Sequence, residues 1–521
     1  MALMRSMMTV GGHTMISRIL GYARDNILAQ VIGAGAVTDA FFMALKLPSI
    51  FRRLFAEGAF NAAFVPMFAG NLATKGKQSA KVFAEHAIMI LALFLLFMVI
   101  SVECFMPEFV KMLAPGFEKT PERLMYTIEF TRITFPFILF ISVSAILGGI
   151  LNSLDRFAAP ASAQSVGNLI IIGALYFFSH YAVNAGYIAA WGALASSLAQ
   201  FVWLYFFCVL AGVPIKLRVP KLTPEVKEFF KKLLPGMVGA GVVQINLLVD
   251  VWLGSYLPEA SISYLNYADR VNQFPLGIIG VAMGVALLPL LTKQIRQGEI
   301  AEAVFTQNRA TEFALLLTIP AAVAIMIYAD SFVALLYGYG KFLEHASNID
   351  QTAYTLGAFC VGLPAYVLIK VFSSSFFARQ DTVTPVAVGL ISVLVNLVIN
   401  WQLMKYYQHV GIALGTAIAS WVNVLLLAGI LKKREMMILD RQLLTSTPKI
   451  LFSAGIMGVI IYYIEPYFGS AIIQGAFWEK MFILSILLII GLIGFLVPAY
   501  FLKAIDPKGM SSMMSREEKV P

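Results

Sequence analysis

Residues 480–503 read KMFILSILLIIGLIGFLVPAYFLK. Between Lys480 and Lys503 this stretch contains no Asp, Glu, Lys, Arg or His. A helix needs about 20 consecutive apolar residues to cross the hydrocarbon core of a bilayer. Because lipid offers no hydrogen bonds, the backbone of such a stretch must satisfy its own polar groups, which a helix does. The stretch therefore predicts a transmembrane α-helix.

The whole chain repeats this composition. It has 521 residues, of which 59% are hydrophobic and 13% charged, and its mean hydropathy is +0.81. An ordinary soluble domain has about 25% charged residues, so we exclude a soluble enzyme and a disordered chain. The sequence predicts an all-α polytopic membrane protein with about fourteen transmembrane helices. Their expected ranges are 8–32, 38–70, 84–106, 127–151, 161–180, 187–211, 228–255, 262–292, 305–337, 351–377, 384–404, 411–431, 448–464 and 480–503.

The basic residues of the loops predict an orientation. With the N-terminus placed inside, 18 Lys and Arg residues fall in the inward loops and five in the outward loops. Cytoplasmic loops carry the excess of Lys and Arg, so we expect both termini in the cytoplasm and no cleaved signal. This bias also explains most of the net charge of +9 without a nucleic-acid partner. The five outward residues are Lys111, Lys119, Arg123, Lys341 and Lys405.

An internal repeat divides the chain. Residues 58–66 resemble 281–289, and 191–204 resemble 414–427, both at an offset of 223. Between them, 151–160 resemble 376–385. Transporters are commonly built from such repeats, with the substrate site at the repeat interface. We expect two pseudo-symmetric six-helix lobes, followed by a C-terminal helix pair and a short cytoplasmic tail. The corresponding ranges are 1–212, 213–432 and 433–521.

Several ionisable residues fall inside predicted membrane helices. The first helix carries a polar face with Arg18, Arg24 and Asp25. In the second, Asp39, Lys46 and Arg53 recur every seven residues, which places them on one stripe. The remaining candidates are Arg52 beside that stripe, Glu57 one turn beyond Arg53, and Arg270 in the eighth helix.

The excess of arginine points to an anionic substrate. An ionisable side chain in mid-bilayer costs at least about 2.5–3.5 kcal/mol, so these arginines must face a wet cavity or be paired. The planar guanidinium suits phosphate and carboxylate, and the cavity is therefore expected to hold a phosphorylated substrate. The alternative is structural ion pairing, such as Arg53 with Glu57 or Arg18 with Asp25. Asp250, flanked by apolar residues in the seventh helix, is a candidate cation site.

Enzymatic motifs are missing from the sequence. It contains no HExxH, GxSxG or P-loop motif, and its three cysteines form no CxxC pair. No segment outside the predicted helices is long enough to hold a soluble active site. The sequence favours a transporter over an enzyme, with no catalytic residues.

Four stretches are similar to a known family. These are SRILGYARD (17–25), TDAFFMALKLPSIFRRLFAEGAFNAAFVP (38–66), YADRVNQFPLGIIGVAMG (267–284) and ARQDTVTP (378–385). They resemble the MurJ (MviN) lipid II flippases of the multidrug/oligosaccharidyl-lipid/polysaccharide (MOP) exporter superfamily. The resemblance runs across essentially the whole chain.

The resemblance implies a specific activity. The substrate would be lipid II, which is undecaprenyl-pyrophosphate-linked disaccharide-pentapeptide, moved from the inner to the outer leaflet of the bacterial cytoplasmic (inner) membrane for cell wall biosynthesis. It also implies a hydrophobic groove for the lipid tail on the last two helices. The family's functional positions fall on Arg18, Arg24, Asp39, Arg52, Arg53 and Arg270, and Asp25 and Glu57 also match the motifs.

The mechanism expected from these residues is alternating access by a monomer. The partners are lipid II and membrane lipids, and no cofactor is expected beyond a coupling cation, Na⁺ or H⁺, and the membrane potential. Some relatives of this kind bind sodium in the C-terminal lobe, and Asp250 is the position expected here. The alternatives are a cation-coupled drug exporter or another polyprenyl-glycan exporter of the same superfamily. A membrane-bound transferase would need a carboxylate or metal site, which the sequence does not offer.

Overall fold

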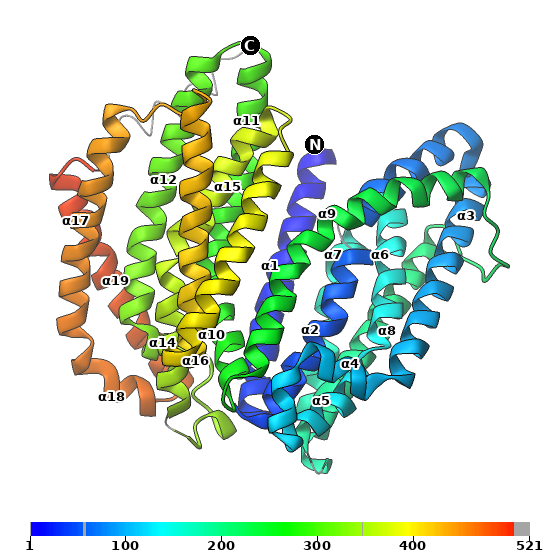
Figure 1. Cartoon of the computed structure of the whole chain (residues 1–521), viewed down its shortest axis with the longest axis horizontal. Coiled ribbons are helices and arrows are strands. Elements are labelled where there is room, and N and C mark those ends of the chain that lie inside the picture. The colour runs from blue at the N-terminus through cyan, green and yellow to red at the C-terminus, as the bar shows by residue number, and fades with distance from the viewer. Residues whose placement is uncertain (1, 56–58, 183, 346, 505–521) are drawn as a thin grey trace. The chain divides into compact units, whose positions relative to one another are not determined.

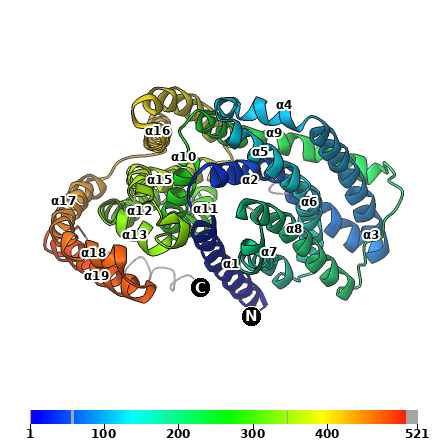
Figure 2. The same cartoon turned by 90° about the horizontal axis from the view of Figure 1, so that it is seen from below.

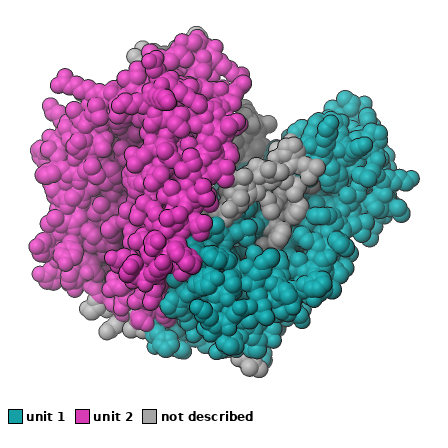
Figure 3. All heavy atoms as spheres, viewed as in Figure 1, with its two compact units in different colours: residues 1–263, 339–345 teal, residues 264–338, 346–521 magenta. Residues whose placement is uncertain are grey.

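The structure is a computed structural model that describes residues 2–55, 59–182, 184–345 and 347–504. These ranges contain helices and no β-strand, which confirms the predicted all-α fold. The chain divides into two compact units, coloured separately in Figure 3. Unit 1 comprises Met1–Ser263 and Tyr339–His345, and unit 2 comprises Tyr264–Gly338 and Ala346–Pro521.

Unit 1 contains the first nine helices (Figures 1 and 2). They are α1 (Ala2–Ile32), α2 (Ala36–Phe55), α3 (Ala59–Cys104), α4 (Met106–Leu113), α5 (Pro121–Thr134), α6 (Phe137–Ser153), α7 (Ala158–Phe178), α8 (Ala185–Leu210) and α9 (Pro224–Ser255), with the short 3₁₀ turns η1 (Pro115–Lys119), η2 (Ser179–Tyr181) and η4 (Gly340–Phe342).

Unit 2 contains most of α10 and all the helices after it. They are α10 (Ser261–Pro275), the π turn η3 (Leu276–Gly280), α11 (Val281–Arg296), α12 (Ile300–Ile327), α13 (Ala329–Leu336), α14 (Ser347–Val361), α15 (Leu363–Ala378), α16 (Val383–Lys433), α17 (Arg441–Ile464), α18 (Pro466–Gln474) and α19 (Phe477–Phe501). The C-terminal helices α17 and α19 pack side by side (Figure 1).

Nine stretches within the described ranges are long and apolar enough to cross a membrane. One of them, Val383–Lys433, contains two predicted spans and bends at Gln408, where the backbone is not helical. Helices α1, α2 and α10 are not among the nine; α1 and α2 carry several charged residues, and α10 has 15 residues. The number of fourteen spans therefore stays a prediction.

One of the expected helices differs from that observed. The predicted helix 262–292 is interrupted by the π turn η3, directly after Pro275. Proline has no N–H and its ring clashes with the carbonyl four residues earlier, and both prolines and π turns are common causes of bends in long helices. The predicted helix 38–70 includes residues 56–58, which lie outside the described residues, between α2 and α3.

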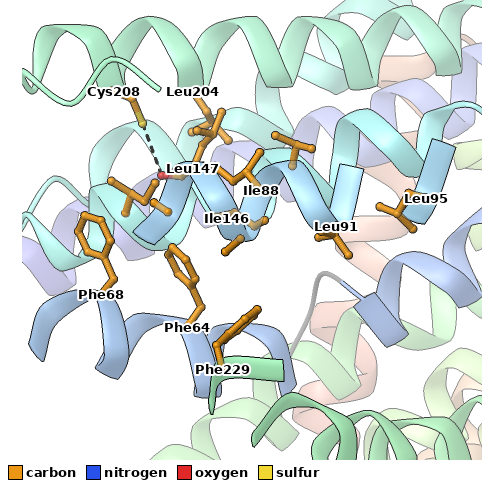
Figure 4. Packing of buried hydrophobic residues seen from close by; sticks show 14 of the residues in the cluster. Phe64, Phe68, Ile88, Leu91, Leu95, Ile146, Leu147, Leu204, Cys208 and Phe229 are labelled. Carbon is orange, nitrogen blue, oxygen red and sulfur yellow. Dashed lines mark hydrogen bonds between the residues drawn. The ribbon is translucent and has the colours of Figure 1, made fainter. Parts of the chain in front are cut away.

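The core of unit 1 joins helices that are distant in the sequence. Phe64 of α3 packs against Phe229 of α9, with ring centroids 5.9 Å apart (Figure 4). Leu147 of α6 accepts a weak hydrogen bond from the thiol of Cys208 on α8. Because α9 packs on α2 and α3, the contacts place 213–263 in unit 1, whereas the repeat had placed this segment in the second lobe.

The internal repeat has a backbone counterpart. Helix α8 ends at a left-handed Gly212, and the N–H of Val213 bonds to the carbonyl of Cys208. The same turn, at an offset of 223, ends the second copy: Glu435 is left-handed and Met436 bonds to Leu431. This is the Schellman arrangement that closes many helices.

Two further pairs of left-handed residues follow the repeat. Gly76 and Gly298 both have φ of 79°. Asp155 and Gln380 have φ of 58° and 62° and are each followed by the same backbone hydrogen bond. The matching partner of Asp155 is thus Gln380. Asp381 lies one position later, where its carboxylate accepts from the N–H and hydroxyl of Thr384.

Candidate functional site

The candidate site begins on α1, where Arg24 is held by two side chains. Its Nε and Nη2 donate to Oδ1 of Asp25 at 3.0 and 2.7 Å. Its Nη1 donates to Oδ1 of Asn168 on α7 at 3.1 Å. Arg24 keeps 20% of its side chain exposed, and Asp25 keeps 7%. A guanidinium has five N–H donors, so Arg24 still has one N–H on each terminal nitrogen for a ligand.

Asn168 ties this arrangement to the backbone of α1. Its Nδ2 donates to the carbonyl of Ser17 at 3.0 Å, two turns before Arg24. Gly21 lies between them, and a Cβ at that position would stand 3.7 Å from the amide. Because one carboxamide contacts both ends of this segment, it fixes the face that α1 presents to α7. The sequence analysis missed Asn168, although a lone amide within the apolar run 166–175 is itself a signal of an interhelical contact.

Arg18 behaves differently from Arg24. Its side chain is exposed, and within the described residues no ion pair or hydrogen bond engages it. The alternative pairing of Arg18 with Asp25 is therefore wrong, because Asp25 pairs with Arg24. Arg18 is available to an external anion.

Asp39 lies in a closed polar cluster in unit 1. Its carboxylate is fully buried, and it accepts from the N–H and hydroxyl of Ser263 at 2.8 and 2.7 Å. Arg123 of α5 lies 3.1 Å from the other carboxylate oxygen, donates to the carbonyl of Leu257 and covers the ring of Phe117 at 4.2 Å. The sequence analysis grouped Asp39 with the arginines expected to face a wet cavity. In the structure its side chain is instead buried within unit 1. Direct contact of Asp39 with substrate stays a prediction.

Arg123 was predicted to lie in an outward loop. It instead lies in the first turn of α5 with 2% of its surface exposed. A buried guanidinium needs a counter-charge, and Asp39 supplies it from 84 positions away in the sequence. No local pattern in the sequence signals that pairing.

The other predicted residues of α2 and α9 are only partly described. Arg53 is exposed near the end of α2. The side chain of Arg52 and the whole of Glu57 lie outside the described residues, and so does a test of the Arg53–Glu57 pair. Asp250 is half-buried on α9. Within the described part of the chain, no three His, Cys, Asp or Glu side chains come together as a metal site.

Arg270, another predicted site residue, lies on α10 of unit 2. Its side chain is exposed, and it precedes the π turn η3 by about one helical turn and a half. Such turns occur frequently at functional sites. The ammonium of Lys370 on α15 approaches this turn, since a Cβ on Gly280 would stand 3.0 Å from it. The structure places this cation beside the π turn.

Comparison with known proteins identifies the family of the chain. The model of the family "Lipid II flippase MurJ" matches residues 28–488. A probable lipid II flippase MurJ of Rhizobium meliloti is 38% identical, with 99% of this chain and 96% of the relative covered. One of Rhizobium tropici is 36% identical, with 100% and 98% covered.

Solved structures give the same answer for the fold. A lipid II flippase MurJ in an inward closed conformation matches with a TM-score of 0.78 at 27% identity, covering 95% of this chain and 98% of that one. An inward-facing MATE transporter of the MOP superfamily matches with a TM-score of 0.65 at 14% identity, covering 80% and 95%, and this likeness concerns the fold alone. Given its full-length sequence matches, this chain belongs to the lipid II flippase MurJ family.

Proposed function

We infer that the protein is a lipid II flippase, a transporter and not an enzyme, that acts in peptidoglycan synthesis. The observation that carries this inference is the match to the MurJ family over 28–488 together with relatives at 36–38% identity over the full chain. The arginines of α1 supply the chemistry. Arg24 retains free N–H groups and Arg18 is exposed, so both suit the pyrophosphate of the substrate.

In this proposal Asp25 and Asn168 tune Arg24. A fixed guanidinium binds an anion without losing side-chain entropy, while the neighbouring carboxylate weakens the attraction. A carrier must release its cargo, so a partly neutralised arginine serves better than a bare one. Arg270 of unit 2 would provide a further contact with the headgroup during the cycle, and the polyprenyl tail would stay in lipid.

The driving force follows from charge. The membrane potential is inside-negative, and outward movement of one negative charge gains about 2.3 kcal/mol per 100 mV. Neither ATP nor a covalent intermediate is required. We place the protein in the bacterial inner membrane with both termini in the cytoplasm, acting as a monomer without a nucleic-acid partner. A cation bound at Asp250 would reset the empty carrier.

The function is tested in cells depleted of the native protein. Depletion should accumulate lipid II in the inner leaflet and make it inaccessible to an impermeant probe that binds the pentapeptide from outside. Wild-type protein should restore access, whereas Arg24→Ala and Arg270→Ala should insert normally and fail to restore it. Full restoration by both variants would refute the phosphate-binding role. Normal outer-leaflet lipid II after depletion would refute the function itself.

The cation proposal has its own test. Asp250→Asn should change the dependence of transport on sodium and pH in vesicles, while transport driven by a large imposed potential persists. An unaltered response to both ions would remove Asp250 from this role and leave the flippase proposal intact.

A further inference from the structure

The segment that links α8 to α9, residues 211–223, exposes large apolar side chains. Leu217, Val219 and Leu222 are exposed by 92%, 76% and 72%. Exposed cationic residues alternate with them, namely Lys216, Arg218 and Lys221. Because unburied apolar side chains of this size are unfavourable in water, a segment that holds three of them outward implies a surface that receives them.

The structure holds this segment in place from α3. The buried carboxylate of Glu85 accepts from the backbone N–H of Lys216 at 3.0 Å and from Nε of Arg218 at 2.8 Å. His86 accepts from the N–H of Lys221 at 3.3 Å. Lys77 donates to the carbonyl of Ala211 at 2.9 Å. The outward direction of the apolar side chains is therefore built into the fold.

A second linker, residues 434–440 between α16 and α17 in unit 2, is held in place in a similar way. At the repeat offset of 223, Glu85 and His86 correspond to Asn308 and Arg309 on α12. Asn308 donates to the carbonyl of Ile438 at 2.7 Å. Arg309 pairs with Asp440.

This second linker also exposes apolar side chains. Ile438 and Leu439 are exposed by 65% and 43%. Exposed basic residues flank them, and these are Lys432, Lys433, Arg434 and Arg441. The anionic partner lies on the bundle in unit 1 (Glu85) and on the linker in unit 2 (Asp440), yet both linkers direct apolar and basic side chains outward. The same kind of linker-to-bundle contact therefore occurs in both units with the signs of the charges reversed. This indicates a shared role for the outward side chains of the two linkers.

Apolar side chains interleaved with Lys and Arg are suited to the interface of an anionic membrane. Both linkers directly follow stretches long and apolar enough to span a bilayer, Ala185–Leu210 and Val383–Lys433. Their side chains are thus positioned where a membrane span ends. We propose that the linkers 211–223 and 434–440 are interfacial anchors that bind anionic phospholipid headgroups and insert their apolar side chains among them. This proposal does not depend on the cargo that the protein carries.

The test measures the depth of Leu217 in a bilayer. Cys104, the exposed cysteine of the described chain, is replaced by Ser, and a nitroxide is attached to Leu217→Cys in full-length protein. The protein is placed in nanodiscs of phosphatidylcholine alone or of equal parts phosphatidylcholine and phosphatidylglycerol. We expect collisions with oxygen to exceed those with a polar nickel chelate, and phosphatidylglycerol to increase the excess. Gln297→Cys, on an exposed polar loop, should favour nickel in both lipids.

A second variant tests whether the positive charges of the linker are required, while it keeps the hydrogen bonds that fix the linker to α3. Lys216 and Lys221 contact Glu85 and His86 through their backbone N–H groups, so Lys216→Gln and Lys221→Gln together leave those contacts possible. This variant should lose the effect of phosphatidylglycerol on the Leu217 label. A label that favours nickel in both lipids would overturn the proposal. Protection of the label only when cytosolic extract is added would also overturn it, in favour of a protein partner.

Discussion

Nη1 of Arg24 lies 3.1 Å from Oδ1 of Asn168, and the same carboxamide donates to the carbonyl of Ser17. A single uncharged side chain on α7 thus sets the direction of an arginine on α1. In a site for a pyrophosphate, the direction of the N–H groups matters as much as the charge itself.

Replacement of Asn168 tests this relationship. Asn168→Leu should reduce transport by roughly tenfold, because a hydrogen bond to a charged group contributes about 1.5–3 kcal/mol. The measurement is outer-leaflet lipid II per molecule of inserted protein. Ser165→Ala, on the same helix and also buried, is the control and should transport normally. Equal activity of Asn168→Leu and wild type would show that Arg24 needs no partner on α7.

The buried pair of Asp39 and Arg123 predicts a large effect on stability. Arg123→Met should lower the free energy of unfolding by about 3–5 kcal/mol, since it leaves a buried carboxylate without its counter-charge. Thermal unfolding in detergent measures the loss. Combining it with Asp39→Asn should cost less than the sum of the two single changes. Arg132→Met, at an exposed position of the same helix, should have little effect, and strict additivity would argue against coupling.

Gly76 predicts a penalty that depends on backbone conformation. Its φ of 79° and ψ of 172° lie in a region that essentially only glycine adopts. Gly76→Ala should therefore destabilise the protein by about 1–3 kcal/mol. Gly70, on the same helix, has open space around it, so Gly70→Ala should stabilise by about 1 kcal/mol. A stabilising Gly76→Ala in the same unfolding measurement would contradict the observed turn.

Asp381, between two membrane stretches, predicts a dependence of stability on pH. Hydrogen bonds from Thr384, and the nearby Arg434, lower the pKa of Asp381 from 3.8 to about 2. The folded protein therefore binds this proton more weakly than the unfolded chain does. The stabilisation that ionised Asp381 provides is fully present above pH 3.8, and it is lost as the pH falls through about 2.

The variant Asp381→Asn should remove that dependence. At neutral pH it should unfold at a lower temperature than the wild type, and below pH 2 the two unfolding temperatures should converge. Glu344→Gln, exposed in a loop, serves as the control. A constant difference between the Asp381 variant and wild type at every pH would exclude the carboxylate as the cause.

Much of the fold was predictable, because hydropathy and the helical period act locally. The prediction failed where a distant partner decides the outcome. Helical spacing aligned Arg18 with Asp25, yet the long side chain of Arg24 reaches its immediate neighbour instead. Arg123 looked like a loop cation because its counter-charge lies on another helix. The candidate arginines were predicted from the free-energy cost of placing a charged side chain in a bilayer. Asn168, which orients one of them, is uncharged, so the same argument does not identify it.

The matched bends of the two units have a consequence for how the chain arose. The pairs Gly76 with Gly298, Asp155 with Gln380 and Gly212 with Glu435 all keep a positive φ, although the amino acids differ in two of the three pairs. The sequence offset between paired residues ranges from 222 to 225, which indicates small insertions and deletions in the helices between these turns. If the two halves arose by duplication, the backbone conformation at these turns was kept while the surrounding residues were substituted. The two halves are therefore best superposed on the matched turns.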